Sequence, residues 1–202
     1  MREAYASAAL FFKPQPTMPM PDLDNGRMIG PIARTGKRRR AELQTRLGLK
    51  PDEKLVLISM GGVDSRIDMD GWPRLPGVRW LVQASWQTHH PDAFDLDKLD
   101  MPFIDLMASC DAMVAKPGYG MFAEAACNGT PLLYVRRDAW PEEVFLVDWL
   151  QANGRCLEVE RQALLRGDVG DSLAALLAQP LPTPVTATGV GEAVAILAGF
   201  LR

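Results

Sequence analysis

Short apolar runs recur along the chain and alternate with segments of helical pattern. The runs are continuous rather than alternating with polar residues, which is typical of strands buried on both faces of a sheet. Such strands, separated by helices, indicate a parallel sheet. The predicted strands are LVLISM (55–60), VRWLVQA (78–84), AMVA (112–115), LLYV (132–135) and CLEV (156–159). We therefore expect an α/β, Rossmann-like fold whose parallel sheet carries helices on both faces.

Helical patterns occupy the intervals between these strands. A glycine follows several of them, as is common where a helix ends. The predicted helices are 37–50, 103–110, 119–128, about 142–152, 171–178 and 191–201. We expect residues 36–180 to form one domain, which is an ordinary length for a single core.

Both ends of the chain differ from this regular middle. Residues 1–35 contain a proline-rich stretch from Pro14 to Pro21 and the turn-favouring Asp24-Asn25-Gly26. Proline fixes an extended backbone, so we interpret 1–35 as an interdomain hinge or the remnant of a preceding domain. Residues 181–202 form a second linker, PLPTP, and a final helix.

Composition excludes several classes of protein. Lysines and arginines number 22 and acids 25, for a net charge of −3, so no overall positive field attracts nucleic acid or an anionic membrane. The three widely spaced cysteines predict buried thiols rather than disulfides or a zinc site. No apolar run reaches the ~18 residues of a membrane span. We expect a cytoplasmic protein, and a peripheral attachment to the inner membrane through a missing domain stays open.

Two glycine-rich loops follow predicted strands, SMGGVDS (59–65) and AKPGYGMF (115–122). Ligands of open parallel sheets bind beyond the carboxyl ends of the strands, where such loops meet helix N-termini. In the second loop, Gly118 and Gly120 allow close approach to the backbone amides of the following helix, which favours an anion. The spacing of these two glycines alone is compatible both with an ordinary turn and with a phosphate-binding loop. Glu124, one turn later, fits either a helix-dipole acid or a ligand of ribose hydroxyls.

The stretch from Asp111 to Val135, DAMVAKPGYGMFAEAACNGTPLLYV, resembles the C-terminal, donor-binding domain of GT-B glycosyltransferases, together with the upstream FIDLMASCD and the downstream WPEE. The likeness is to family 28, which includes the GlcNAc transferase of peptidoglycan synthesis. KPGYG followed by VRRD also looks like the transferase-like module fused to sugar kinases such as arabinokinase. The motifs cover about residues 50–160. The flanks resemble the hinge and the crossing helix that join this domain to an N-terminal acceptor domain.

This resemblance implies a nucleotide-sugar donor as the ligand, and it assigns positions to its parts. The diphosphate falls on the backbone amides of Gly118, Tyr119, Gly120 and Met121. The resemblance assigns Glu124 to binding the ribose, and Phe103 and the backbone of Ile104 to binding the base. In the first loop Gly61, Gly62 and Ser65 are further donor-side candidates, although Asp64 between them departs from the usual pattern and would repel a phosphate.

The sugar falls on Glu142 and Glu143, where the family often has an amide pair, and this departure leaves the sugar undefined. Arg136 and Arg137 leave strand 132–135 at its carboxyl end and face the same crevice. One of them is a candidate to offset the charge of Glu142 and Glu143 or to pair with phosphate through its guanidinium, against the alternative of surface arginines. We assign His89 and His90 to a loop, and Trp86 to the core or a lid. The general base is expected in the missing acceptor domain, so the catalytic residues are unknown, and no metal or cofactor is expected.

The leading hypothesis is therefore the donor-binding half of an inverting glycosyltransferase that uses a UDP-sugar, inactive as an isolated fragment. Asp64 and the paired glutamates favour an alternative, a non-catalytic nucleotide-sugar-binding or regulatory module. A third possibility is a GT-B nucleotide-sugar epimerase or hydrolase, whose catalytic acids would come from Glu124, Glu142 and Glu143.

Overall fold

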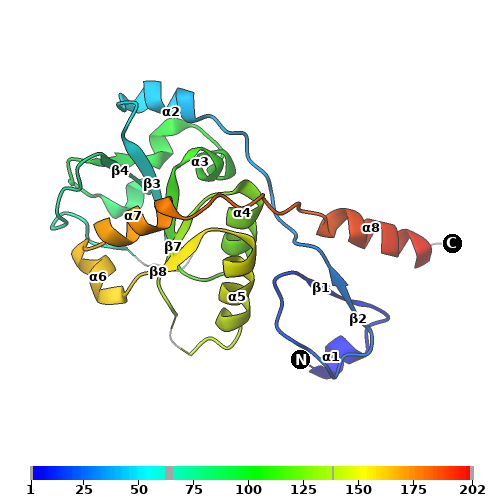
Figure 1. Cartoon of the computed structure of the whole chain (residues 1–202). Helices are drawn as coiled ribbons and strands as arrows, with labels where there is room; N and C mark the ends of the chain where they lie inside the picture. The colour runs from blue at the N-terminus through cyan, green and yellow to red at the C-terminus, as the bar shows by residue number, and fades with distance from the viewer. Residues whose placement is uncertain (1, 62–65, 138, 201–202) are drawn as a thin grey trace.

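The computed structural model describes residues 2–61, 66–137 and 139–200, in which strands and helices alternate over most of the chain (Figure 1). The strands are β1 (Phe11–Pro14), β2 (Gly26–Ile29), β3 (Lys54–Ser59), β4 (Val78–Val82), β5 (Ala93–Asp95), β6 (Ala112–Ala115), β7 (Leu132–Tyr134) and β8 (Cys156–Glu158). The α-helices are α1 (Arg2–Ala6), α2 (Arg40–Leu47), α3 (Phe103–Ser109), α4 (Tyr119–Asn128), α5 (Glu143–Asn153), α6 (Arg161–Arg166), α7 (Gly170–Ala178) and α8 (Gly189–Phe200). Two 3-10 helices are η1 (Ala84–Trp86) and η2 (Leu96–Leu99).

The main sheet has the strand order β5-β4-β3-β6-β7-β8, and every neighbouring pair is parallel. The chain therefore builds outward from β3 in one direction through β4 and β5, and in the other through β6, β7 and β8. The order reverses between β3 and β6, which is where ligands of open α/β sheets bind. The predicted Rossmann-like parallel sheet is confirmed, with β5 as a strand that the sequence patterns missed.

Helices cover both faces of this sheet, as predicted (Figure 1). Alternate residues of β3 show the division, because Leu55 and Leu57 enter one core and Val56 and Ile58 the other. The first core includes residues of α2, α3, α4 and α5, and the second includes residues of α6 and α7. Each of these four β3 side chains is fully buried, which contributes about 1.5–3 kcal/mol per side chain relative to exposure.

The N-terminal segment and α8 lie together beside the main sheet rather than within it (Figure 1). β1 pairs in parallel with β2, and α8 contacts β2. Val190, Val194 and Leu197 of α8 are exposed. Among the described residues, no helix has both the length and the apolar content that a bilayer crossing requires.

An extended segment, residues 32–39, joins this part to the main domain and is held by side chains of α3 and α4. Asn128 of α4 donates from Nδ2 to the carbonyl of residue 34 and accepts the amide of Gly36 at Oδ1 (3.0 and 2.8 Å). Asp105 and Ser109 of α3 accept the amides of residues 37 and 39 (2.8 and 2.7 Å). These bonds keep residues 37–39 extended, so the predicted start of a helix at residue 37 is wrong and α2 begins at Arg40.

The remaining differences from the predicted elements concern short segments. The sequence patterns missed α6 and β2, and at the start of the chain they left a short helix and a strand as alternatives, where the structure has both α1 and β1. Each of these elements has six residues or fewer, and a helix or strand this short gives little periodicity. The carboxyl end of the predicted helix 37–50 also moves, by three residues to Leu47, and the other boundaries shift by at most two residues. All three cysteines are free and buried, as predicted.

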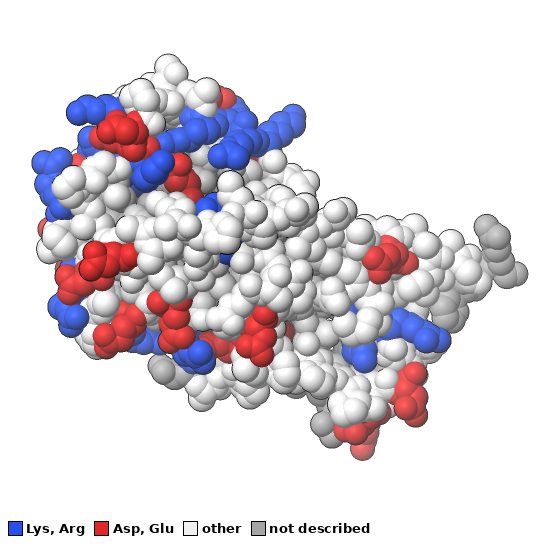
Figure 2. Space-filling view, in the orientation of Figure 1, with Lys and Arg blue, Asp and Glu red and all other residues white. Residues whose placement is uncertain are grey.

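On the face in Figure 2 the basic side chains gather around α2, and acids and bases are interspersed elsewhere over the sheet domain.

Gly36 has little room, since a Cβ built on it would collide with the main-chain carbonyl of Ile104. We predict that Gly36→Ala destabilises the protein by about 1–3 kcal/mol, because the backbone of the segment or of α3 must shift. Urea unfolding measures this effect. Gly71→Ala is the control, since no atom lies within 4 Å of a Cβ there, and we expect a change within about 0.5 kcal/mol. Equal effects of the two substitutions would contradict the prediction.

Candidate functional site

The two predicted glycine-rich loops meet at the point where the strand order reverses. Ser59 and Ala115, the last residues of β3 and β6, are register partners, so the loops leave from adjacent strand ends. A Cβ built on Gly61 would lie 3.7 Å from Lys116 Cε, which places the described part of the first loop against the second. The candidates Gly62 and Ser65, and Asp64 between them, lie outside the described residues.

The amino end of α4 faces this crevice with unused hydrogen-bond donors. Gly118 is the N-cap residue, in an extended conformation (φ −170°, ψ 140°), and no side chain of the described residues caps the helix. The first helical amide bond runs from Phe122 to the Gly118 carbonyl (3.0 Å), so the amides of residues 119–121 precede the first intrahelical bond. A Cβ on Gly118 or Gly120 would meet no atom of the described residues within 4 Å. This end of α4 thus offers backbone amides, the positive end of the helix dipole and open space.

Tyr119 uses its side chain for a structural contact. Its hydroxyl accepts the amide of Ile32 (3.0 Å) and donates to the carbonyl of Gln15 (3.1 Å), which ties the N-terminal segment to the start of α4. Burial raises the pKa of this phenol, so the hydroxyl stays protonated near neutral pH. Only the backbone of Tyr119 is left for a ligand, in line with the sequence prediction for this residue, which concerns its amide.

Glu124 forms an ion pair with Arg34 of the extended segment, with 2.8 Å between Arg34 Nε and Glu124 Oε1. The hydrogen bond to this carboxylate raises the pKa of Arg34. The Glu124 side chain is 12% exposed and that of Arg34 73%, so the carboxylate lies in the wall and the guanidinium lies over it. Glu124, the residue predicted to bind the ribose, is therefore partly exposed and already pairs with Arg34.

Phe103 and Ile104, the predicted base-binding residues, begin α3 after its N-cap Pro102. Both side chains are half-buried and pack against the first core. The Ile104 carbonyl lies directly under Gly36. The same extended segment therefore borders both the predicted ribose position and the predicted base position.

Glu142 and Glu143 differ in their surroundings. Glu143 is buried, and its Oε2 accepts the main-chain amide of Arg137 (2.7 Å), while Oε1 lies 3.8 Å from Arg136 Nη1. Glu142 is the half-buried N-cap residue of α5, and its carbonyl accepts the amide of Leu146. Glu143 thus fixes the loop after β7, whereas the Glu142 carboxylate makes no hydrogen bond within the described ranges.

The two arginines of the loop after β7 point to different partners. Arg136 pairs with Glu158 (2.8 Å), and this bond raises the pKa of its guanidinium. The Arg137 guanidinium lies over the Trp140 ring, 4.2 Å from its centroid, and Nη1 donates to the Pro117 carbonyl (3.4 Å). Because Pro117 directly precedes the N-cap of α4, the exposed charge of Arg137 lies beside the free amides of that helix.

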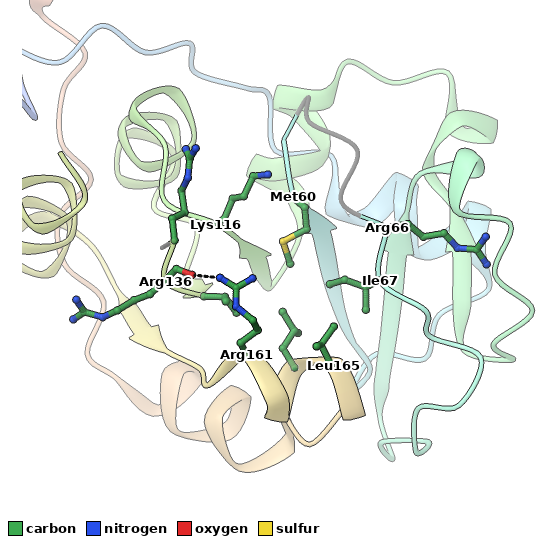
Figure 3. A pocket seen from close by; sticks show the side chains of 10 residues that line it. Met60, Arg66, Ile67, Lys116, Arg136, Arg161 and Leu165 are labelled. Atoms are coloured by element: carbon green, nitrogen blue, oxygen red, sulfur yellow. Dashed lines mark hydrogen bonds between the residues drawn. The ribbon is translucent and has the colours of Figure 1, made fainter. Parts of the chain in front are cut away.

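A cavity of about 150 Å³ lies next to these loops, at the carboxyl ends of β3, β6 and β7 (Figure 3). Arg161 of α6 extends into it and donates to the Arg136 carbonyl (2.8 Å), whereas Arg66 points away. Lys116 and apolar side chains such as Met60 also line the cavity. The sequence did not single out Lys116 or Arg161, and the one available signal for Lys116 was its place directly before Pro117-Gly118.

The described residues contain no group of three or more His, Cys, Asp and Glu side chains placed to hold a metal ion. His89 and His90 lie in a loop, as predicted. His89 Nδ1 lies 3.4 Å from Asp70 Oδ2, and the His90 Nδ1 accepts the amide of Asp92 (3.2 Å). Both precede β5 and so lie toward the amino end of the parallel strands, away from the crevice. Trp86 is buried in the second core, one of its two predicted places.

Comparison with known proteins gives one curated relative. L-arabinokinase of Arabidopsis thaliana is 30% identical over 151 residues, which make up 74% of this chain and 14% of that protein. The chain therefore spans only a small part of the relative, and the match fits the predicted likeness to the transferase-like module of arabinokinases. No protein-family model matches the chain.

Solved structures of glycosyltransferases are similar in fold. The spinosyn rhamnosyltransferase SpnG is 17% identical with a TM-score of 0.54, over 89% of this chain and 48% of that one. The calicheamicin glycosyltransferase CalG4 is 16% identical with a TM-score of 0.53, over 77% and 40%. The glycosyltransferase VinC, solved in complex with DTDP, is 17% identical with a TM-score of 0.53, over 90% and 55%. The chain thus spans about half of each of these proteins, and it has the Rossmann-like fold of the C-terminal half of GT-B glycosyltransferases.

Proposed function

We propose that this chain is the donor-binding half of a glycosyltransferase that takes a nucleotide-diphospho-sugar. The observation that carries the proposal is the amino end of α4, where the strand order reverses. Among the described residues no side chain caps its amides, and no atom lies within 4 Å of a Cβ built on Gly118 or Gly120. A diphosphate needs such a seat, because backbone amides and the helix dipole stabilise its charge without a net basic surface. The fold supports this reading, as does VinC, a glycosyltransferase solved with DTDP.

The other parts of the donor follow in order around the crevice. The ribose lies at Glu124 and the base at Phe103 and Ile104. The sugar extends past Arg137 and Glu142 toward the cavity that Lys116 and Arg161 line. We further propose a family 28-like, inverting transfer from a UDP-sugar, in which a base of another domain deprotonates the acceptor hydroxyl. The α4 amides and Arg137 then stabilise the departing diphosphate as its charge develops.

A non-catalytic binding module is the second candidate, and the buried Glu143 favours it. The carboxylate of Glu143 is committed to the Arg137 amide, so only Glu142 of the predicted pair has a carboxylate without a described partner. The same observation disfavours an epimerase or hydrolase, because two of the three candidate acids, Glu124 and Glu143, already have partners.

Titration of the chain with UDP, GDP, dTDP and their sugars by calorimetry tests the proposal. We expect binding of at least one nucleoside diphosphate and no release of free sugar from the isolated chain. Absence of binding by every nucleotide would exclude the proposed function. Release of free sugar would instead favour a hydrolase.

Gly120→Val tests the diphosphate seat. The new side chain meets none of the described residues in the unliganded protein, so we expect an unfolding temperature within a few degrees of the wild type. The same side chain fills the space over the α4 amides, so we expect nucleoside diphosphate affinity to fall by at least about tenfold, or 1.4 kcal/mol. Gly191→Val is a matched control, because Gly191 also lies in the first turn of a helix with no atom within 4 Å of a Cβ. An unchanged affinity in Gly120→Val would place the diphosphate elsewhere.

Arg137→Met tests the charge beside the seat. We expect UDP to bind about tenfold more weakly, because a charge-assisted hydrogen bond to phosphate contributes roughly 1.5–3 kcal/mol. Arg136→Met removes the same charge one residue away, where Glu158 already pairs with it, and we expect a smaller loss. Isothermal calorimetry at two salt concentrations measures both variants. A larger loss in Arg136→Met would reverse the assignment.

A further inference from the structure

One of the two carboxylate oxygens of Glu124 already accepts a hydrogen bond within the protein. Arg34 Nε holds Oε1 at 2.8 Å, and Oε2 accepts no hydrogen bond from the residues that the structure describes. A free carboxylate has two oxygens and can accept one hydrogen bond from each of two adjacent ribose hydroxyls. With Arg34 in place, Glu124 offers one unoccupied oxygen.

Arg34 is held at its main chain as well as at its guanidinium. Asn128, one turn beyond Glu124 on α4, donates to the Arg34 carbonyl and accepts the amide of Gly36. The Arg34 backbone is thus fixed over the same helix that carries Glu124, so the ion pair forms between two positioned groups. A ligand hydroxyl at Oε1 must either displace this charge-assisted bond or share the oxygen with it, and a carboxylate oxygen whose charge a guanidinium already neutralises is a weaker acceptor.

We propose that Arg34 determines how the site treats the sugar of the nucleotide, so that 2′-deoxyribonucleotides are accepted nearly as well as ribonucleotides. The inference rests on the proposed function, in which Glu124 faces the ribose. Ribose and 2′-deoxyribose share the 3′-hydroxyl, which takes Oε2. The 2′-hydroxyl finds Oε1 already bonded to Arg34 and adds little affinity.

Calorimetry with the matched pairs UDP/dUDP and GDP/dGDP tests this inference, since each pair differs only at the 2′ position. We expect the wild-type dissociation constants within a pair to differ by less than about threefold. Arg34→Met frees Oε1, so we expect the preference for the ribonucleotide to rise to about tenfold, the value of one hydrogen bond to a charged group. Arg34 is largely exposed, so the variant is expected to fold.

Arg38→Met is the matched control, because Arg38 is an exposed arginine of the same extended segment and has no contact with Glu124 among the described residues. We expect its ratio to equal that of the wild type. In the double variant Arg34→Met with Glu124→Ala, the preference is expected to vanish again, which ties the effect to this carboxylate rather than to the loss of one positive charge.

The outcomes separate this inference from the proposed function. If the wild type prefers ribonucleotides by tenfold or more, or if Arg34→Met leaves the ratio unchanged, the inference is wrong while nucleotide binding stands. If the wild type binds none of the four nucleotides, the proposed function fails and the inference fails with it.

Discussion

The pairing of β3 with β6 is the constraint on which the rest of the molecule depends. Both strands are buried on both faces apart from the first residue of β3, and the chain leaves them in opposite directions, so their two carboxyl-end loops have no crossover helix between them. The crevice follows from this topology rather than from any particular side chain. Apolar strand residues thus decide where Gly61 and Lys116, which belong to the two loops, come together.

Helix α4 connects this crevice to the rest of the chain. Its first turn offers amides to an anion, and Glu124 and Asn128 hold the extended segment 32–39 along its length. The Tyr119 hydroxyl ties the N-terminal part to the same helix end. The amides at the amino end of α4 and the side chains that hold the extended segment therefore belong to one helix of ten residues. A change in the position of the segment is expected to alter the position of these amides.

The sequence predicts the parallel sheet and both glycine loops because these features are local. Continuous apolar runs identify β3, β6 and β7, and Gly118 before a helical pattern marks the amino end of α4. The partner of Glu124 was not predictable, because Arg34 lies 90 residues from Glu124 along the chain and no periodicity links them. A pairing of Arg136 or Arg137 with the acids at 142 and 143 was predicted, and Arg136 Nη1 lies 3.8 Å from Glu143 Oε1. Tertiary contacts also overrode helix propensity at residues 37–39, where Asp105 and Ser109 hold the backbone extended. The predicted roles of the site residues stay predictions.

The buried position of Glu143 bears on how such a site can change during evolution. Its carboxylate accepts the Arg137 amide, which the carbonyl oxygen of glutamine could also accept, although glutamine would lose the ion pair with Arg136. Shorter or apolar residues would leave the Arg137 amide without this partner. The carboxylate of Glu142 accepts no hydrogen bond from the described residues. Of the two neighbouring acids, one is constrained by folding and the other is not. If the proposed function holds, changes in sugar preference are therefore expected at residue 142 rather than at residue 143.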